Sequence, residues 1–114
     1  MKNKDPNSHL HLMMDSFRKA KKYLGDMSYE DFLQDEKTQS AVIMQLHVIG
    51  ELSKNILENT KKEIDIPWRD IAGMRDIIAH DYFGMDLKVV WDTAKQSVPE
   101  AEVAIDKYLK SIGE

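Results

Sequence analysis

Apolar side chains recur at steps of three and four residues through the first part of the chain, with polar and charged residues between them. This spacing places the apolar side chains on one face of a helix. The stripe consists of Leu10, Met13, Met14, Phe17, Ala20 and Leu24. Asp5 is suited to cap such a helix, Pro6 to its first position and Gly25 to its end. We therefore expect a helix from about Pro6 to Gly25.

The next part of the chain predicts a short helical turn followed by a long helix. Residues 28–31 read SYED, which resembles a capping box. Asp35 can cap the following helix, which we expect to reach about Asn59. Its apolar face consists of Ala41, Val42, Leu46, Ile49, Leu52 (or Ser53) and Ile56. A glycine inside a helix costs roughly 1 kcal/mol relative to alanine, so Gly50 indicates a close approach by another helix.

The remaining pattern completes a helical bundle. Residues 60–66 are polar and basic and predict a loop, after which Pro67 is suited to start a helix that ends near Gly84. A last helix is expected from Asp86, with a kink or break at Pro99, because proline loses an N–H and clashes with the preceding turn. The pattern therefore predicts an all-α protein, an up-and-down bundle of four or five helices in one domain spanning residues 1–114.

Composition narrows the possible functions. The chain has 114 residues and no cysteine, which excludes a disulfide scaffold, a thiolate metal site and a cysteine nucleophile. It begins with a polar segment and has no apolar run long enough to span a membrane, so we expect a cytoplasmic protein with no membrane partner. The net charge of −4 argues against broad nucleic-acid binding, but it leaves room for a small basic cleft.

The residues that could carry chemistry gather in one segment. Residues 75–82 read RDIIAHDY, which brings Arg75, Asp76, His80 and Tyr82 into eight consecutive positions. On a continuous helix, Asp76 would lie under His80, and Arg75 under Tyr82. Arg75 and His80 are five residues apart and would diverge on a straight helix. Two copies of the helix facing each other across a two-fold axis would bring both residue types into one cleft.

Such a cleft suits the cleavage of RNA. Arginine presents a planar fork of donors to a phosphate, and histidine can give or take a proton near neutral pH. Asp76 could hold the imidazole of His80 in one tautomer. RNA supplies its own 2′-hydroxyl nucleophile, so the reaction needs neither a metal nor another cofactor. The alternative from spacing alone is that these side chains are ordinary surface or ion-pair residues.

The same segment resembles a known family. Arg75, four intervening residues, His80 and Tyr82 match the R-x4-H-x-Y form of HEPN domains that is found in the HepT toxin family. Residues 48–52 (VIGEL) resemble that family's I-G-E stretch, and residues 66–74 (IPWRDIAGM) resemble its P-W-x-x-I-x-G lead-in. Residues 86–91 resemble the start of its last helix. The resemblance extends from the first helix to about Pro99.

The resemblance implies a specific biochemical role. The family consists of helical homodimers with a composite cleft at the two-fold axis, and its active members are metal-independent endoribonucleases that act as toxins. Their antitoxins are nucleotidyltransferases similar to MntA, which transfer AMP from ATP to the motif tyrosine. Carried over, Arg75 would stabilise the phosphate, His80 would be the general acid or base, and Asp76 would assist it. Tyr82 would accept AMP, which would block RNA by bulk and charge.

Several other residues leave alternatives open. Glu51 is either a surface residue or a residue that orients a side chain beside the Arg75–His80 cleft. His9 and His11 point to opposite sides of a helix and are poor chelators, and His47 is expected to be a packing or interface residue.

Trp68 and Trp91 are expected to anchor the core or a dimer interface rather than to stack on bases, and Lys54, Lys61 and Lys62 to be solvated. For the protein as a whole, the competing hypothesis is a non-catalytic helical module that binds a nucleotidyltransferase.

Overall fold

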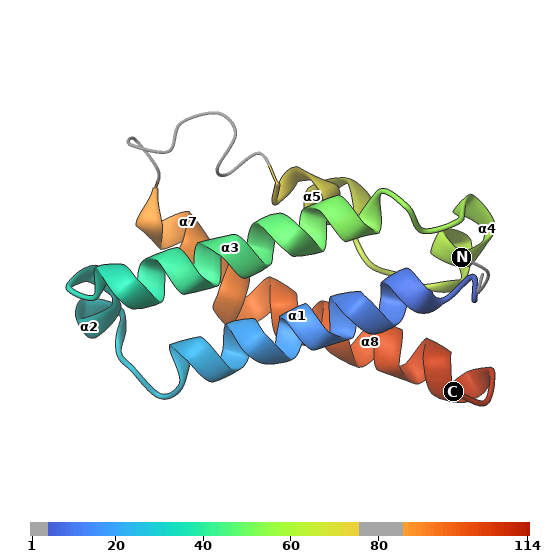
Figure 1. The fold of residues 1–114 in the computed structure, drawn as a ribbon, viewed down its shortest axis with the longest axis horizontal. Helices are drawn as coiled ribbons and strands as arrows, with labels where there is room; N and C mark the ends of the chain where they lie inside the picture. The colour runs from blue at the N-terminus through green and yellow to red at the C-terminus, as the bar shows by residue number, and fades with distance from the viewer. Residues whose placement is uncertain (1–4, 76–85) are drawn as a thin grey trace.

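The computed structural model describes residues 5–75 and 86–114, which are helical and contain no strand. Three long elements lie side by side: α1 (Ser8–Leu24), α3 (Glu36–Ser53), and a C-terminal rod made of α7 (Leu87–Asp92), η1 (Thr93–Ser97) and α8 (Val98–Ser111). α1 runs antiparallel to both of the others, as Figure 1 shows. The predicted all-α, up-and-down bundle is confirmed.

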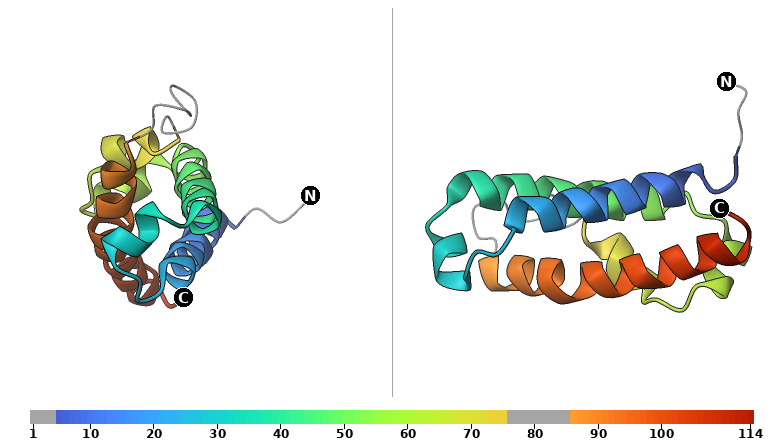
Figure 2. Two further views of the ribbon diagram at one scale, coloured as in Figure 1. Left: turned by 90° about the vertical axis from the view of Figure 1, so that its left-hand side faces the viewer. Right: turned by 90° about the horizontal axis from the view of Figure 1, so that it is seen from below.

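Three short helices complete the described fold. α2 (Tyr29–Leu33) links α1 to α3 at one end of the bundle. α4 (Glu58–Glu63) lies near the opposite end, and α5 (Trp68–Gly73) packs against α3. The end view in Figure 2 shows the long elements surrounding a common interior. Because α5 packs on the second half of α3, it brings the end of the IPWRDIAGM segment to the middle of the bundle.

The predicted caps of α2, α3 and α7 are confirmed. The Ser28 hydroxyl accepts a hydrogen bond from the Asp31 N–H, and the Asp86 carboxylate accepts one from the Lys88 N–H. Asp35 accepts hydrogen bonds from both the N–H and the hydroxyl of Thr38, which hold the pKa of its carboxyl below the usual range. These contacts satisfy N–H groups that the first turn of a helix leaves without a partner.

The first helix starts slightly later than predicted. α1 begins at Ser8 with Asn7 as its cap residue, rather than at Pro6. The Asp5 carboxylate still accepts a hydrogen bond, but from the N–H of Asn7, within the turn that leads into the helix. Aspartate commonly stabilises such turns by bonding to the backbone two residues ahead.

The prediction was wrong about the length of α3 and about the loop after it. α3 ends at Ser53 rather than near Asn59, and the Ser53 hydroxyl donates to the Gly50 carbonyl. Residues Glu58–Glu63 form α4, in a region that was partly predicted to be a loop. The indole of Trp68 donates to the carbonyls of Lys61 and Ile64 at the end of this turn. The polar residues of this segment do not by themselves indicate a helix, because the tryptophan that holds its end lies outside the segment.

The helix that follows Pro67 is also shorter than predicted. α5 begins at Trp68 as expected but ends at Gly73, and Met74 and Arg75 lie in a turn beyond it. Arg75 is therefore not part of a continuous helix with the residues before it. The predicted alignment of Arg75 under Tyr82 concerns residues beyond this turn, and because Tyr82 lies outside the described residues, the alignment stays a prediction.

A wide helical turn precedes Pro99. Residues Thr93–Ser97 form a π-helix, and the N–H of Val98 bonds to the carbonyl of Thr93. Pro99 follows in the first turn of α8, where its missing N–H matters least. The expected disturbance at Pro99 is thus a change of helix type rather than a break, since a π-turn is one way to relieve a strained helical ladder.

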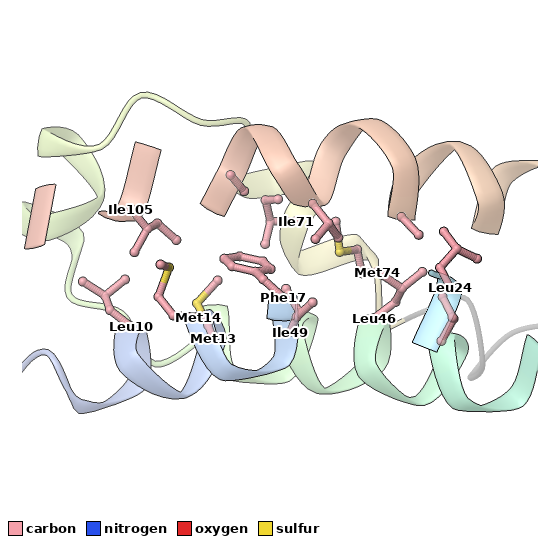
Figure 3. Close-up of a cluster of buried hydrophobic side chains, with 14 of the residues drawn as sticks. Leu10, Met13, Met14, Phe17, Leu24, Leu46, Ile49, Ile71, Met74 and Ile105 are labelled. Carbon is pink, nitrogen blue, oxygen red and sulfur yellow. The ribbon is translucent and has the colours of Figure 1, made fainter. Parts of the chain in front are cut away.

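The apolar stripes meet in the interior of the bundle. Figure 3 shows side chains from α1 and α3 facing those of α5 and α8, with Phe17 near the centre. Phe17, Leu46 and Ile105 are completely buried. Within the described ranges, no helix combines the length and the hydropathy needed to cross a bilayer.

Candidate functional site

Arg75 is held in place by a single face of α3. Its guanidinium Nε lies 3.3 Å from a carboxylate oxygen of Glu51, and the two side chains are 36% and 48% exposed. Its carbonyl lies 3.2 Å from Nδ1 of His47, and because a carbonyl oxygen can only accept, the imidazole donates this hydrogen bond. The side chain and the backbone of Arg75 are therefore both anchored, while part of the side chain stays exposed to solvent.

Gly50 lets α3 and Arg75 approach each other this closely. A Cβ atom at position 50 would lie 2.5 Å from the backbone nitrogen of Arg75 and 3.1 Å from the carbonyl oxygen of Ala72. Real side chains do not tolerate a backbone contact of 2.5 Å. The prediction that this interior glycine serves a close approach is confirmed, and the segment that approaches is the end of α5 together with Arg75.

His47, Gly50 and Glu51 are spaced at i, i+3 and i+4, so they lie on the same face of α3. Each contacts a different part of Arg75: the carbonyl, the backbone nitrogen and the guanidinium. The sequence pointed to Gly50 and Glu51, whereas His47 was expected to be a packing or interface residue. The spacing of His47 relative to Glu51 was the available signal, because two polar residues one turn apart on an apolar helix favour a shared contact.

The other predicted site residues cannot be placed in the same way. Asp76, His80 and Tyr82 lie outside the described residues, so their distances to Arg75 and Glu51 stay predictions. Arg75 is the last described residue before them. The described part of the candidate site therefore consists of Arg75 and the residues of α3 that contact it.

His11 and the two tryptophans make their contacts with other residues than Arg75. His11 hydrogen-bonds to Glu114 rather than pairing with His9. Trp91 packs against the rings of Tyr29 and Phe32, and Trp68 packs against the core, so both tryptophans are packing residues as expected. Neither is available for stacking on a base without leaving these contacts.

Comparison with known proteins decides the family. The sequence pattern of the family described as "Ribonuclease HepT-like" matches residues 13–108. This match covers most of the chain and includes every element that positions Arg75. The chain belongs to the HepT-like ribonuclease family.

Individual HepT-like proteins agree with this assignment. "Probable ribonuclease HepT" from Thermococcus cleftensis is 46% identical over 86 residues, covering 75% of this chain and 78% of that protein. A "Putative RNase" from Methanocaldococcus jannaschii is 35% identical over 113 residues, covering 98% and 93%. Another from Caldanaerobacter subterraneus is 38% identical over 85 residues, covering 74% and 76%. No solved structure matches significantly.

The family membership confirms two predictions made from the sequence. The chain is a HepT-like member of the HEPN class, and its enzyme class is that of an endoribonuclease. The anchored, half-exposed Arg75 is consistent with this class, because a guanidinium in a fixed position can bind a phosphodiester through two parallel hydrogen bonds.

Proposed function

We propose that this protein is a metal-independent endoribonuclease that acts as the toxin of a toxin–antitoxin pair in the cytoplasm. The observation that carries the proposal is the anchoring of Arg75 by His47, Gly50 and Glu51. An arginine held at both its backbone and its side chain is preorganised for a charge that develops during reaction. The motif then supplies His80 five residues further along the chain.

The proposed reaction is an intramolecular transesterification of the RNA strand. The 2′-oxygen attacks the neighbouring phosphorus, forming a 2′,3′-cyclic phosphate, and the bond from phosphorus to the 5′-oxygen breaks. The 2′-proton passes to a base, and the leaving 5′-oxygen receives a proton. His80 carries out one of these two proton transfers, and Asp76 orients the imidazole of His80. Arg75 offsets the negative charge on the phosphorus oxygens.

The enzyme is proposed to be a homodimer with a composite cleft. A second copy of the chain, related by a two-fold axis, would contribute its own Arg75 and His80 to the same RNA-binding cleft. This arrangement supplies two histidines, one for each proton transfer. Size-exclusion chromatography with light scattering should therefore give the mass of two chains, and a monomeric active enzyme would contradict this part of the proposal.

Cleavage in the absence of metal is the direct test. Purified, unmodified protein should degrade cellular RNA in the presence of excess EDTA and leave products with 2′,3′-cyclic phosphate ends. Loss of cleavage on adding EDTA, with recovery on adding a divalent cation, would contradict the mechanism. Failure to degrade any cellular RNA would favour the alternative function, a non-catalytic helical partner of a nucleotidyltransferase.

Tyr82 is proposed as the regulatory residue. An MntA-like nucleotidyltransferase antitoxin would catalyse attack of the tyrosine oxygen on the α-phosphorus of ATP, with loss of the phenolic proton and departure of pyrophosphate. The new phosphodiester places a negative charge and an adenosine close in sequence to Arg75, which opposes RNA binding.

Intact mass provides the check on this regulation. Protein produced together with its antitoxin should carry roughly 329 Da for each added AMP, since covalent modification is the switch. A Tyr82→Phe variant produced in the same way should show the unmodified mass and slow growth. An unmodified wild-type mass under these conditions would contradict the regulatory proposal.

Glu51 is proposed as a positioning residue for Arg75. In a Glu51→Gln variant, kcat should fall by about 10- to 100-fold, because a small misplacement of a catalytic group is costly. KM for RNA should stay the same or decrease, since a negative charge is lost beside the phosphate site. Stability should change little, because the ion pair is partly exposed.

Glu58→Gln is the matched control for this variant. It removes the 3.6 Å contact of the exposed Glu58 carboxylate with the half-buried Lys61, another carboxylate–cation pair at the surface. The control should leave kcat and KM unchanged. A Glu51→Gln variant with wild-type kcat would show that this carboxylate does not position Arg75, whereas partial recovery in Glu51→Asp would support the assignment.

A further inference from the structure

Two hollows meet at the exposed end of α5. The first has a volume of about 380 Å³ and is lined by Lys54, Arg69, Ala72, Gly73 and Arg75. The second has a volume of about 310 Å³ and lies between α5 and the α7–η1 part of the C-terminal rod. Arg69 and Gly73 line both hollows. A single extended ligand could therefore occupy both of them by crossing α5 at Gly73.

The first hollow is strongly basic. Among the described residues, three of the five that line it are cationic and none of the five carries a carboxylate, although Glu51 pairs with Arg75 at its edge. Lys54 and Arg69 are exposed, and across the described part of the chain neither forms an ion pair. The protein as a whole carries a net charge of −4, so this is a local concentration of positive charge. Unpaired lysine and arginine side chains beside one another are the groups that bind backbone phosphates of nucleic acids.

The second hollow has a different chemical character. Met74 and Val89 provide apolar surface, and Val89 is 49% exposed at its edge. Thr93 and Ser97, both in η1, add hydroxyl groups. Its volume lies at the lower end of the range of small-molecule sites. Asp70 also lines it, and its carboxylate disfavours a phosphate there. A hollow of this size with apolar walls, hydroxyl groups and a carboxylate suits a nucleobase rather than a phosphate.

Gly73 separates the two hollows with bare backbone. It does not have a positive φ, and no heavy atom of the described residues lies within 4 Å of the place where its Cβ would be. Neither the backbone conformation nor the internal packing of the described protein therefore calls for a glycine here. The lack of a side chain leaves a low ridge at the point where a strand would pass from one hollow to the other.

We propose that the nucleotide next to the scissile phosphate binds across Gly73. Its phosphate lies in the basic hollow on Lys54 and Arg69, and its base lies in the apolar hollow against Met74 and Val89. The inference rests on the proposed ribonuclease function and deepens it, because it names the residues that hold the RNA strand beside Arg75. It assigns RNA affinity to residues outside the R-x4-H-x-Y motif.

The test measures binding separately from cleavage. The probe is a single-stranded 2′-O-methyl oligoribonucleotide of about ten nucleotides, which cannot be cleaved and is long enough to fill a typical single-strand site. A Lys54→Gln/Arg69→Gln double variant should bind it at least about tenfold more weakly than wild type. The slope of log affinity against log salt should decrease by about 0.7, the value for one phosphate of a single strand that is no longer neutralised.

A charge-matched double variant provides the control. Lys22→Gln/Arg18→Gln makes the same changes on α1, away from α5, and should keep wild-type affinity and salt dependence. Equal affinity of the Lys54/Arg69 variant and wild type would overturn the proposal. So would a variant that keeps RNA affinity but loses binding to a protein partner, since the basic hollow would then be a protein-docking site.

A second variant tests the crossing point. Gly73→Leu places bulk on the ridge and should weaken oligonucleotide binding at least about fivefold while leaving the Tm of the protein unchanged or higher, because leucine is a better helix former than glycine. A Gly73→Leu variant with wild-type affinity would overturn the path across α5. Wild type that binds the oligonucleotide through Lys54 and Arg69 but cleaves no RNA would overturn the proposed function alone.

Discussion

Replacing His80 with alanine should lower the rate of RNA cleavage by about 10²- to 10⁴-fold, the usual contribution of a positioned general acid or base. Replacing Arg75 with alanine should cause a loss of similar size, because removing one preorganised donor to a developing oxyanion costs about 10²- to 10³-fold. Cleavage of a fluorescent RNA oligonucleotide by the purified proteins measures both effects.

The two losses should differ in their pH dependence. A histidine that titrates near neutrality shapes the pH–rate profile, so the His80→Ala variant should lose the limb that the imidazole causes. The Arg75→Ala variant should keep the shape of the profile at a lower rate. Both variants should retain the helical circular dichroism spectrum of the wild type and its oligomeric state in solution. A His80→Ala variant with wild-type activity would contradict the assignment of His80.

Gly50→Ala is expected to have the second largest effect, and it acts on the fold and on the site together. The added Cβ would lie 2.5 Å from the backbone nitrogen of Arg75, so α5 or α3 must move. Overpacking of this kind costs about 1–3 kcal/mol, whereas the better helix propensity of alanine returns at most about 1 kcal/mol. The Tm should therefore fall, and Arg75 should shift relative to Glu51.

The displacement of Arg75 should also reduce catalysis. A misplacement of about 1 Å can cost roughly 100-fold in rate, so kcat should fall even at temperatures where the variant is folded. Thermal unfolding and RNA cleavage below the Tm measure the two effects separately. Gly73→Ala is the stability control, because its Cβ would meet no described atom within 4 Å. A Gly50→Ala variant as stable and as active as wild type would show that the close contact is not required.

The helical stripes and their caps were predictable because they depend on local chemistry. The Ser28, Asp35 and Asp86 side chains each bond to an N–H two or three residues ahead, so a short sequence window contains both partners. The apolar residues of α1 are buried as their spacing predicted. Membership of the HepT-like family was also readable from four ordered motif blocks, and the comparisons confirm it.

The errors lie where contacts between separate elements override local helical preference. Periodicity alone favoured a helix reaching about Asn59 and another reaching about Gly84, yet α3 ends at Ser53 and α5 at Gly73. The indole of Trp68 binds the carbonyls at the end of α4, and Gly50 admits the backbone that follows α5. Each of these contacts joins separate elements, so a sequence window that covers one element does not reveal it.

The sequence by itself thus determined the helical class, the family and the segment that contains Arg75 and His80, because these depend on local spacing and on residue identity. Only the tertiary structure decided how Arg75 is held. His47, Gly50 and Glu51 are about 25 residues earlier in the chain, and the packing of α5 on α3 brings them to its carbonyl, its backbone nitrogen and its guanidinium. The same packing forms the basic hollow from Lys54, Arg69 and Arg75, which no local pattern in the sequence connects.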